Sequence, residues 1–141
     1  MPEIRFRVAS VIMDVLLERE PFTDSAAKLL ALVDNGRIRG SICATTVTTV
    51  FYIAAKDFGR RRARDQVHGL LGLFEVAPVD RDVLDGALDL DFSDYEGAVV
   101  HEAARALGAT AIVTRDRRGF ANSAIPALDP KELLAAIAAT S

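Results

Sequence analysis

The chain has 141 residues, which is the size of one domain with a single hydrophobic core. Half of the residues are apolar and 26% are charged, a balance that excludes a disordered, collagen-like or low-complexity chain. The net charge of −3 argues against a protein that binds polyanions through its overall charge, and the single cysteine, Cys43, excludes an internal disulfide or a zinc site made of several cysteines.

The pattern of apolar residues predicts short strands that alternate with helices. In the first half of the chain the predicted elements are a strand at 4–8, an apolar stretch at 11–17, a helix at 24–33, a strand at 39–44 and a helix at 45–57. The segment 45–53 is rich in β-formers, but the helix-friendly residues that follow it favour a helix.

The second half continues the alternation. Its predicted elements are a helix at 61–73, a strand at 74–77, helices at 81–88 and 94–107, a strand at 111–113 and a helix at 130–138. This order predicts an α/β domain over 1–141, in which right-handed βα units place helices on both faces of a mostly parallel sheet. In such sheets the functional residues lie just beyond the carboxyl ends of the strands.

Several common sites are missing from the sequence. It has no glycine-rich nucleotide-binding loop and no Gly-x-Ser-x-Gly turn. His68 and His101 stand alone and are predicted to lie on helix surfaces, while Cys43 is predicted to be a small buried apolar residue. No apolar run approaches the roughly 20 residues that span a bilayer, and the first ten residues lack the pattern of a secretion signal, so we predict a cytoplasmic protein with no membrane contact.

Carboxylates at the boundaries of elements are the remaining candidates for chemistry. Hard cations such as Mg²⁺ and Mn²⁺ prefer oxygen ligands, and convergent carboxylates can hold one beside a phosphodiester and activate water. Each acid can also merely cap a helix, and Asp94 in particular stands where a helix begins. The candidate acids are Asp14, Asp91, Asp94, Glu96 and Asp116.

Three segments in this order resemble the PIN-domain family, which includes the VapC-like toxin ribonucleases of toxin–antitoxin pairs. They are Val11–Phe22, the acidic Asp91–Glu96 and Gly108–Asp116, and the similarity extends over almost the whole chain. The resemblance implies a three-layer α/β/α sandwich around a central, mostly parallel sheet. It also implies cleavage of RNA with Mg²⁺ or Mn²⁺, a small antitoxin protein as partner, and a homodimer.

The family pattern also implies roles for individual residues. Asp94, Asp116 and Asp14 are the implied catalytic acids, and the implied metal ligands are Asp94, Asp116, Asp91 and Glu96. The first acid of the family pattern falls on Val8, so Asp14 matches a second, more variable acid. In the threonine-rich middle helix, where many relatives carry a metal-site Glu or a polar substitute, the nearest match is Thr49.

The 14 arginines are the candidates for contact with RNA, because a guanidinium can bind phosphate through two hydrogen bonds. Arg115, Arg117 and Arg118 stand next to the predicted cleft and are the predicted phosphate contacts. The arginines of 60–64 either begin a solvated helix or contact the RNA backbone. Phe51 and Tyr52 are predicted to lie in the core.

Two functions from different classes follow from the sequence. The first is a toxin-like, metal-dependent ribonuclease. Its activity is impaired by the valine at position 8 unless Asp14 or Asp91 supplies the metal ligand that the valine cannot provide. The second is a catalytically silent module of the same fold that binds RNA or a protein partner. An RNA-cleavage assay with and without Mn²⁺ separates the two.

Overall fold

The computed structural model describes residues 7–9, 23–114 and 118–140. Its described strands form one five-stranded sheet with the order β3-β2-β1-β4-β5, and every pairing in it is parallel. The strands are β1 (Arg7–Ala9), β2 (Arg39–Cys43), β3 (Glu75–Ala77), β4 (Ala111–Val113) and β5 (Ala127–Leu128). The parallel sheet predicted from the sequence is confirmed.

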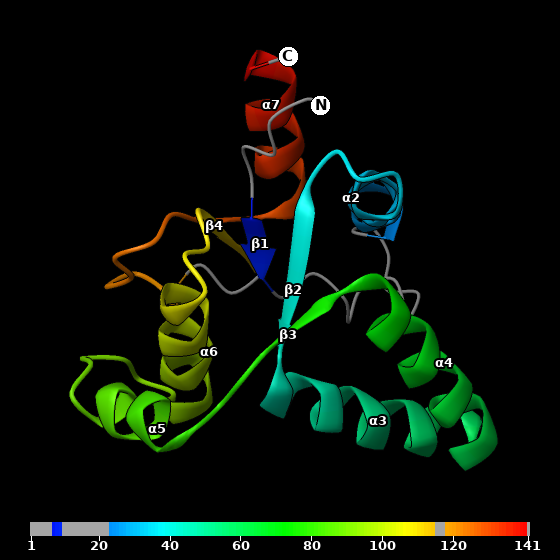
Figure 1. Cartoon of the computed structure of the whole chain (residues 1–141), viewed down its shortest axis with the longest axis horizontal. Helices are drawn as coiled ribbons and strands as arrows, with labels where there is room; N and C mark the ends of the chain where they lie inside the picture. The colour runs from blue at the N-terminus through cyan, green and yellow to red at the C-terminus, as the bar shows by residue number, and fades with distance from the viewer. Residues whose placement is uncertain (1–6, 10–22, 115–117, 141) are drawn as a thin grey trace.

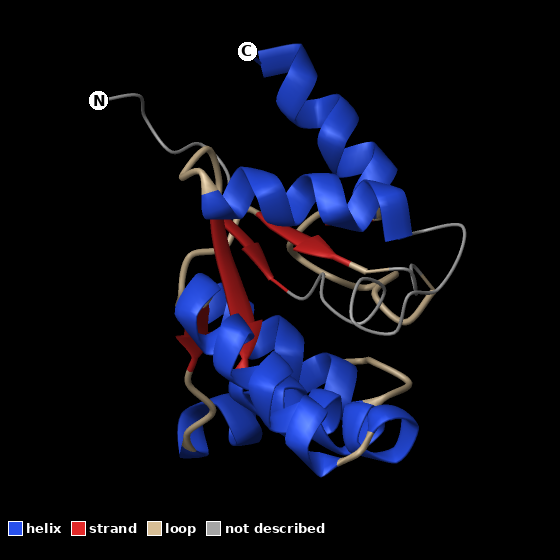
Figure 2. Ribbon diagram, turned by 90° about the vertical axis from the view of Figure 1, so that its right-hand side faces the viewer, coloured by secondary structure: helices blue, strands red, loops and turns tan. Residues whose placement is uncertain are grey.

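Helices cover both faces of this sheet (Figures 1 and 2). They are α2 (Thr23–Asp34), α3 (Ala44–Phe58), α4 (Arg60–Leu73), α5 (Arg81–Leu88), α6 (Tyr95–Ala106) and α7 (Pro130–Thr140). In Figure 1, α2 and α4 lie on one side of the strands and α5 and α6 on the other. The chain is therefore a three-layer α/β/α sandwich, as predicted. No helix in the described ranges is long and apolar enough to cross a membrane.

Side chains along the strands point alternately to the two faces of the sheet and so form a hydrophobic core on each face. In β4, Ala111 and Val113 pack with Leu29 and Leu133 of the α2 and α7 layer, whereas Ile112 packs with Ala104 of α6. In β2, Ile42 faces α4 while Cys43 joins the core beneath α6. This period of two is what a strand buried on both faces requires. The prediction that Cys43 is a buried apolar residue is confirmed.

The prediction that Tyr52 lies in the core is wrong. The segment 45–57 forms α3 as predicted, with Val50 and Ala54 buried, but the Tyr52 side chain is 72% exposed. Residues 50 and 54 are one helical turn apart and share the inward face, which turns position 52 toward solvent. Phe51 is half-buried and meets the Tyr52 ring edge to face at 5.4 Å.

Gly40 sets how closely β2 approaches the α2 and α4 layer. A Cβ on Gly40 would lie 2.6 Å from Cε1 of Phe74 and 3.0 Å from Cγ2 of Val33. We expect Gly40→Ala to lower the free energy of unfolding by about 1–3 kcal/mol because it overpacks this core. Gly69→Ala is the matched control, since a Cβ at that helical position meets nothing within 4 Å, and it should add about 0.5–1 kcal/mol. Urea unfolding midpoints measure both, and equal midpoints would contradict the close packing.

Candidate functional site

The carboxyl ends of the parallel strands share one edge of the sheet, at the bottom of Figure 1. Helix α3 begins at Ala44, directly after β2 ends at Cys43. Helix α6 runs in the opposite direction, because only four residues separate its last residue, Ala106, from the start of β4. The amino-terminal turn of α6 therefore lies at the same edge as the amino-terminal half of α3.

Asp94 is the residue that caps α6. Its Oδ1 accepts a hydrogen bond from the backbone N–H of Glu96 and its Oδ2 accepts one from that of Gly97, both at 3.3 Å. These bonds satisfy two of the N–H groups that a helix start leaves without partners. The side chain is exposed, so its carboxylate stays open to solvent while it caps the helix. The capping role weighed from the sequence is confirmed.

Glu96 reaches from α6 to α3. The hydroxyl oxygen of Thr49 lies 3.3 Å from Oε1 of Glu96 and 3.2 Å from the carbonyl oxygen of Thr45, so its single hydrogen is shared between these two acceptors. Two residues that are 47 positions apart in the sequence, and that the family pattern had singled out separately, are thus brought together. The contact joins the amino-terminal turn of α6 to α3 at the carboxyl edge of the sheet.

The donor set at this edge suits a hard cation. Asp94, Glu96 and Thr49 offer only oxygen atoms, and Mg²⁺ is commonly held by one or two carboxylates together with water and substrate phosphate. Asp91 lies in the loop before α6, where its carbonyl oxygen accepts a hydrogen bond of 2.7 Å from Nδ2 of Asn122. Within the described residues no three His, Cys, Asp or Glu side chains gather as metal ligands.

Four of the predicted site residues lie outside the described residues, namely Asp14, Arg115, Asp116 and Arg117. Arg118 is described and exposed. The backbone of Val8 is described as part of β1, where its Cα pairs with those of Gly40 and Ala111. Position 8 therefore stands in the middle of the sheet, one residue before the carboxyl end of the central strand.

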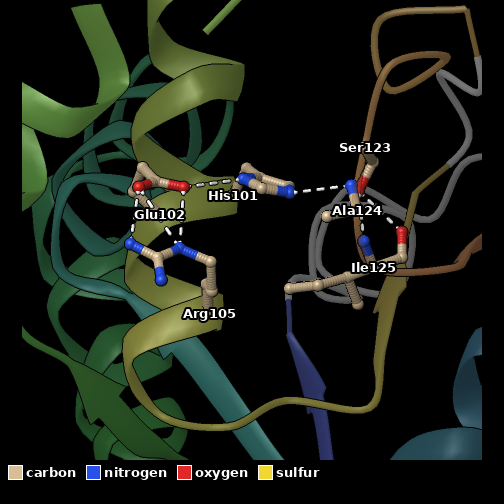
Figure 3. A network of polar contacts seen from close by, with 6 residues as sticks. All are labelled: His101, Glu102, Arg105, Ser123, Ala124 and Ile125. Carbon is tan, nitrogen blue, oxygen red and sulfur yellow. Dashed lines mark hydrogen bonds and ion pairs between the residues drawn. The ribbon is translucent and has the colours of Figure 1, made fainter. Parts of the chain in front are cut away.

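A buried polar network, missed in the sequence, lies further along α6 (Figure 3). His101 is only 2% exposed, so the prediction that it lies on the helix surface is wrong. Its Nε2 accepts a hydrogen bond of 3.1 Å from the backbone N–H of Ala124, and its Nδ1 lies 2.9 Å from Oε2 of Glu102. The proton is therefore assigned to Nδ1, which donates to the carboxylate. His68, by contrast, is exposed on α4 as predicted.

Glu102 holds the other side of the network. Its carboxylate accepts hydrogen bonds from Nε and Nη2 of Arg105, the shortest at 3.0 Å, although only 8% of its side chain is exposed. Gly86 of α5 makes room for this carboxylate, because a Cβ at that position would lie 2.9 Å from Oε1 of Glu102. A charge buried between two helices is thus paired on both oxygens.

The network also ties the segment after β4 to α6. His101 binds Ala124, and the Phe92 ring lies 5.3 Å from the His101 ring and 5.6 Å from the Phe120 ring. Asn122 adds its bond to the carbonyl of Asp91. Residues 120–124 are therefore held against the loop that leads into Asp94.

The network predicts a specific loss of stability in acid. The hydrogen bonds from Arg105, aided by His101 and opposed by burial, lower the pKa of Glu102 below its usual value. Because the unfolded chain then binds the proton more readily, this contribution is present above the ordinary glutamate pKa of about 4.3 and is lost as the pH falls through the folded value. We expect Glu102→Gln to flatten the acid limb of a plot of unfolding free energy against pH.

Glu75→Gln is the control for this experiment. Glu75 pairs with Arg39 at 2.9 Å, but both side chains are 44% exposed, so this ion pair contributes little. Urea unfolding of the three proteins over an acid pH series measures the effect. Acid limbs of equal slope in the native chain and in Glu102→Gln would refute the assignment.

Comparison with known proteins places this fold. VapBC2 from Rickettsia felis bound to a DNA fragment from its promoter is similar with a TM-score of 0.67 at 12% identity, over 87% of this chain and 97% of the other. A toxin–antitoxin complex from Klebsiella pneumoniae is similar with a TM-score of 0.66 at 18% identity, over 88% and 97%. VapC20 from Mycobacterium tuberculosis, a toxin that cleaves the sarcin–ricin loop, gives 0.59 at 14% identity, over 75% and 86%.

At these identities the structural similarity concerns the fold alone, and no curated protein matches the sequence. The family model of the PIN domain matches residues 9–118, which include β2, β3, β4 and helices α2 to α6. The resemblance drawn from the three sequence segments is thereby confirmed. The chain belongs to the PIN domain family.

Proposed function

We propose that this protein is a divalent-metal-dependent ribonuclease and acts as the toxin-like component of a toxin–antitoxin pair in the cytoplasm. One observation carries the proposal: in a chain of the PIN domain family, Asp94 caps α6 and the Glu96 carboxylate two residues further on accepts a hydrogen bond from Thr49, at the carboxyl edge of a parallel sheet. The solved toxin–antitoxin complexes of the same fold support an antitoxin protein as partner. A homodimer is part of the same proposal and rests on the family resemblance of the sequence.

Asp94 and Glu96 would hold Mg²⁺ or Mn²⁺ together with Asp116, and Asp14 or Asp91 would complete the set. The cation would polarise the phosphodiester and lower the pKa of a bound water. The protein contributes the positioning. Thr49 restrains the Glu96 carboxylate, and the α6 backbone restrains that of Asp94.

The arginines after β4 belong to the same proposal. Arg118 is exposed, and together with Arg115 and Arg117 it would bind the phosphates of the RNA strand. Each phosphate contact that is lost weakens binding and reduces its dependence on salt concentration.

The presence of valine at position 8 favours a second candidate function. In this alternative the chain is a PIN-fold module that binds RNA or a protein partner and has no nuclease activity. The family pattern expects an acid at this position, next to the carboxyl end of the central strand. Without that carboxylate the site attracts a cation less strongly, so both metal affinity and rate are reduced.

Cleavage of a fluorescently labelled RNA by the purified chain distinguishes the two candidates. The ribonuclease proposal predicts cleavage that requires Mn²⁺ or Mg²⁺, stops with EDTA and spares DNA of the same sequence. RNA binding with no cleavage at any Mn²⁺ concentration would select the binding module. Cleavage that persists unchanged in EDTA would remove the metal from the proposal.

A further inference from the structure

Helix α3 carries an exposed stripe that starts at the candidate site. Thr49, Tyr52 and Lys56 are spaced i, i+3 and i+7, so they lie on one face of the helix. Thr49 contacts Glu96, the Tyr52 ring is 72% exposed, and Lys56 is exposed in the last turn. The stripe thus leads along the surface from the carboxyl edge of the sheet, here called the acidic edge because Asp94 and Glu96 lie there. It extends over about 10 Å from Thr49 to Lys56.

The stripe ends at the arginines of α4. Gly59, with a φ of 91°, is the only residue between the end of α3 at Phe58 and the start of α4 at Arg60, so the arginines of 60–64 follow directly after it. Arg62 is accounted for by packing, because its guanidinium carbon lies 4.8 Å from the centre of the Phe58 ring. The other three, Arg60, Arg61 and Arg64, are exposed.

These three arginines line a surface hollow of about 450 Å³ together with Asp65. In the described part of the chain no ion pair joins Arg60, Arg61 or Arg64 to a carboxylate. The hollow therefore carries three positive charges against the one negative charge of Asp65. An exposed hollow with this excess of guanidinium groups is suited to an anion with several charges.

The stability of α4 does not explain this arrangement. The first turn of the helix contains no acid and its N-cap, Gly59, has no side chain to accept a hydrogen bond. Cations near the amino terminus of a helix oppose its dipole, and like charges one turn apart repel each other. The arginines thus cost the folded chain free energy, which a bound polyanion would offset.

We propose that Tyr52, Lys56, Arg60, Arg61 and Arg64, here named the α3–α4 track, bind the part of a single-stranded RNA that extends beyond the acidic edge. This inference rests on the proposed function. Exposed aromatic rings stack on bases and cations follow the backbone in sites that take single strands with little sequence preference. The exposed ring favours RNA over an acidic protein segment, which would use the arginines and not the tyrosine.

The test is RNA binding in EDTA, where the ribonuclease proposal predicts no cleavage, with uridine-only RNAs of about 4 and about 16 nucleotides. We expect the native chain to bind the longer RNA more tightly. Tyr52→Ala should weaken binding of the longer RNA about 5- to 150-fold, because stacking contributes about 1–3 kcal/mol per base, and Tyr52→Phe should bind as the native chain does. Arg60→Ala/Arg64→Ala should reduce the slope of log affinity against log salt by about 1.4.

Lys28→Ala/Arg37→Ala is the matched control, since it removes two exposed cations from α2 and the turn that follows it. It should leave affinity and salt slope close to those of the native chain. Unchanged affinity and slope in the Tyr52→Ala and Arg60→Ala/Arg64→Ala proteins would overturn the α3–α4 track. If Tyr52→Ala instead dissociates a dimer in sedimentation and RNA affinity stays the same, the surface joins two copies of the chain and the proposal is wrong.

The two proposals fail separately. If the native chain cleaves no RNA with Mn²⁺ but the track variants bind the longer RNA more weakly, the ribonuclease proposal fails and the track stands. If the native chain cleaves RNA and the track variants bind it as the native chain does, the track fails and the ribonuclease stands. A further outcome is that polyglutamate displaces RNA from the native chain while the track variants bind RNA as the native chain does. That outcome would mean that the arginines bind an acidic protein, and it would overturn the track.

Discussion

Replacing Val8 by aspartate should raise Mn²⁺-dependent RNA cleavage by at least about tenfold, since it would restore a third carboxylate beside those of Asp94 and Asp116. Position 8 lies in the central strand, where its backbone pairs with β2 and β4. Without metal we expect a stability cost of about 1–3 kcal/mol, because an acid placed near other acids is unfavourable until a cation neutralises it. Mn²⁺ should recover this loss by binding the folded chain preferentially.

Val8→Asn is the control for this gain. It brings a polar side chain of the same size without the charge, so it should cost stability but show little rescue by Mn²⁺. Thermal melts and RNA cleavage of the three proteins across a Mn²⁺ series measure both effects. If Val8→Asp gains neither metal-dependent stabilisation nor activity, position 8 is not part of a metal site and the binding module becomes the better account.

Asp94→Asn should reduce Mn²⁺-dependent cleavage by about 100-fold or more while leaving the fold intact. Asparagine caps a helix as well as aspartate does, so the hydrogen bonds to the backbone of α6 can persist. The negative charge that would bind the cation is lost, and a cation at such a site supplies several kcal/mol of transition-state stabilisation. Asp94→Ala should lose the cleavage and, in addition, about 1 kcal/mol of stability through the missing cap.

Asp80→Asn is the matched control. Asp80 caps α5 in the same way, with its side chain accepting a hydrogen bond of 3.0 Å from the backbone N–H of Val83. The change of residue is the same, but it should leave cleavage as in the native chain. Cleavage rates and melting temperatures of the four proteins separate capping from metal binding, and full activity in Asp94→Asn would show that Asp94 only begins the helix.

Much of the fold follows from local sequence signals. The helix at 81–88 and the strand at 111–113 have the predicted bounds, because a capping aspartate opens the first and a short apolar run defines the second. The helix predicted over 94–107 is α6, shorter by one residue at each end. The two-residue strand β5 was not predicted, since Ala127–Leu128 is too short to show any periodicity.

The polar network around His101 could not be predicted from the sequence, because the amphipathic pattern of α6 indicated a helix with only one buried face. Every residue from Ala98 to Ala104 is buried, because α6 lies between the sheet and α5. A helix covered on both sides places polar side chains in the interior, and these then require partners. The pair Glu102 and Arg105, one turn apart, was a signal for part of the network, whereas the bond from His101 to Ala124 depends on tertiary structure.

The candidate site was predicted in part. Capping by Asp94 follows from its place before an amphipathic segment, and the carboxyl edge follows from the parallel topology. The contact between Thr49 and Glu96 joins α3 to α6, so no local pattern reveals it. The roles of Asp14 and Asp116 stay predictions.

A crystal structure of the chain soaked with Mn²⁺, with anomalous scattering recorded at the manganese edge, tests the central claim most directly. The ribonuclease account predicts an anomalous peak at the carboxyl edge of the sheet, within about 2.0–2.6 Å of a carboxylate oxygen of Asp94 or Glu96. The peak should vanish in crystals of Asp94→Asn. Manganese bound only elsewhere, or no ordered manganese at this edge, would contradict the account.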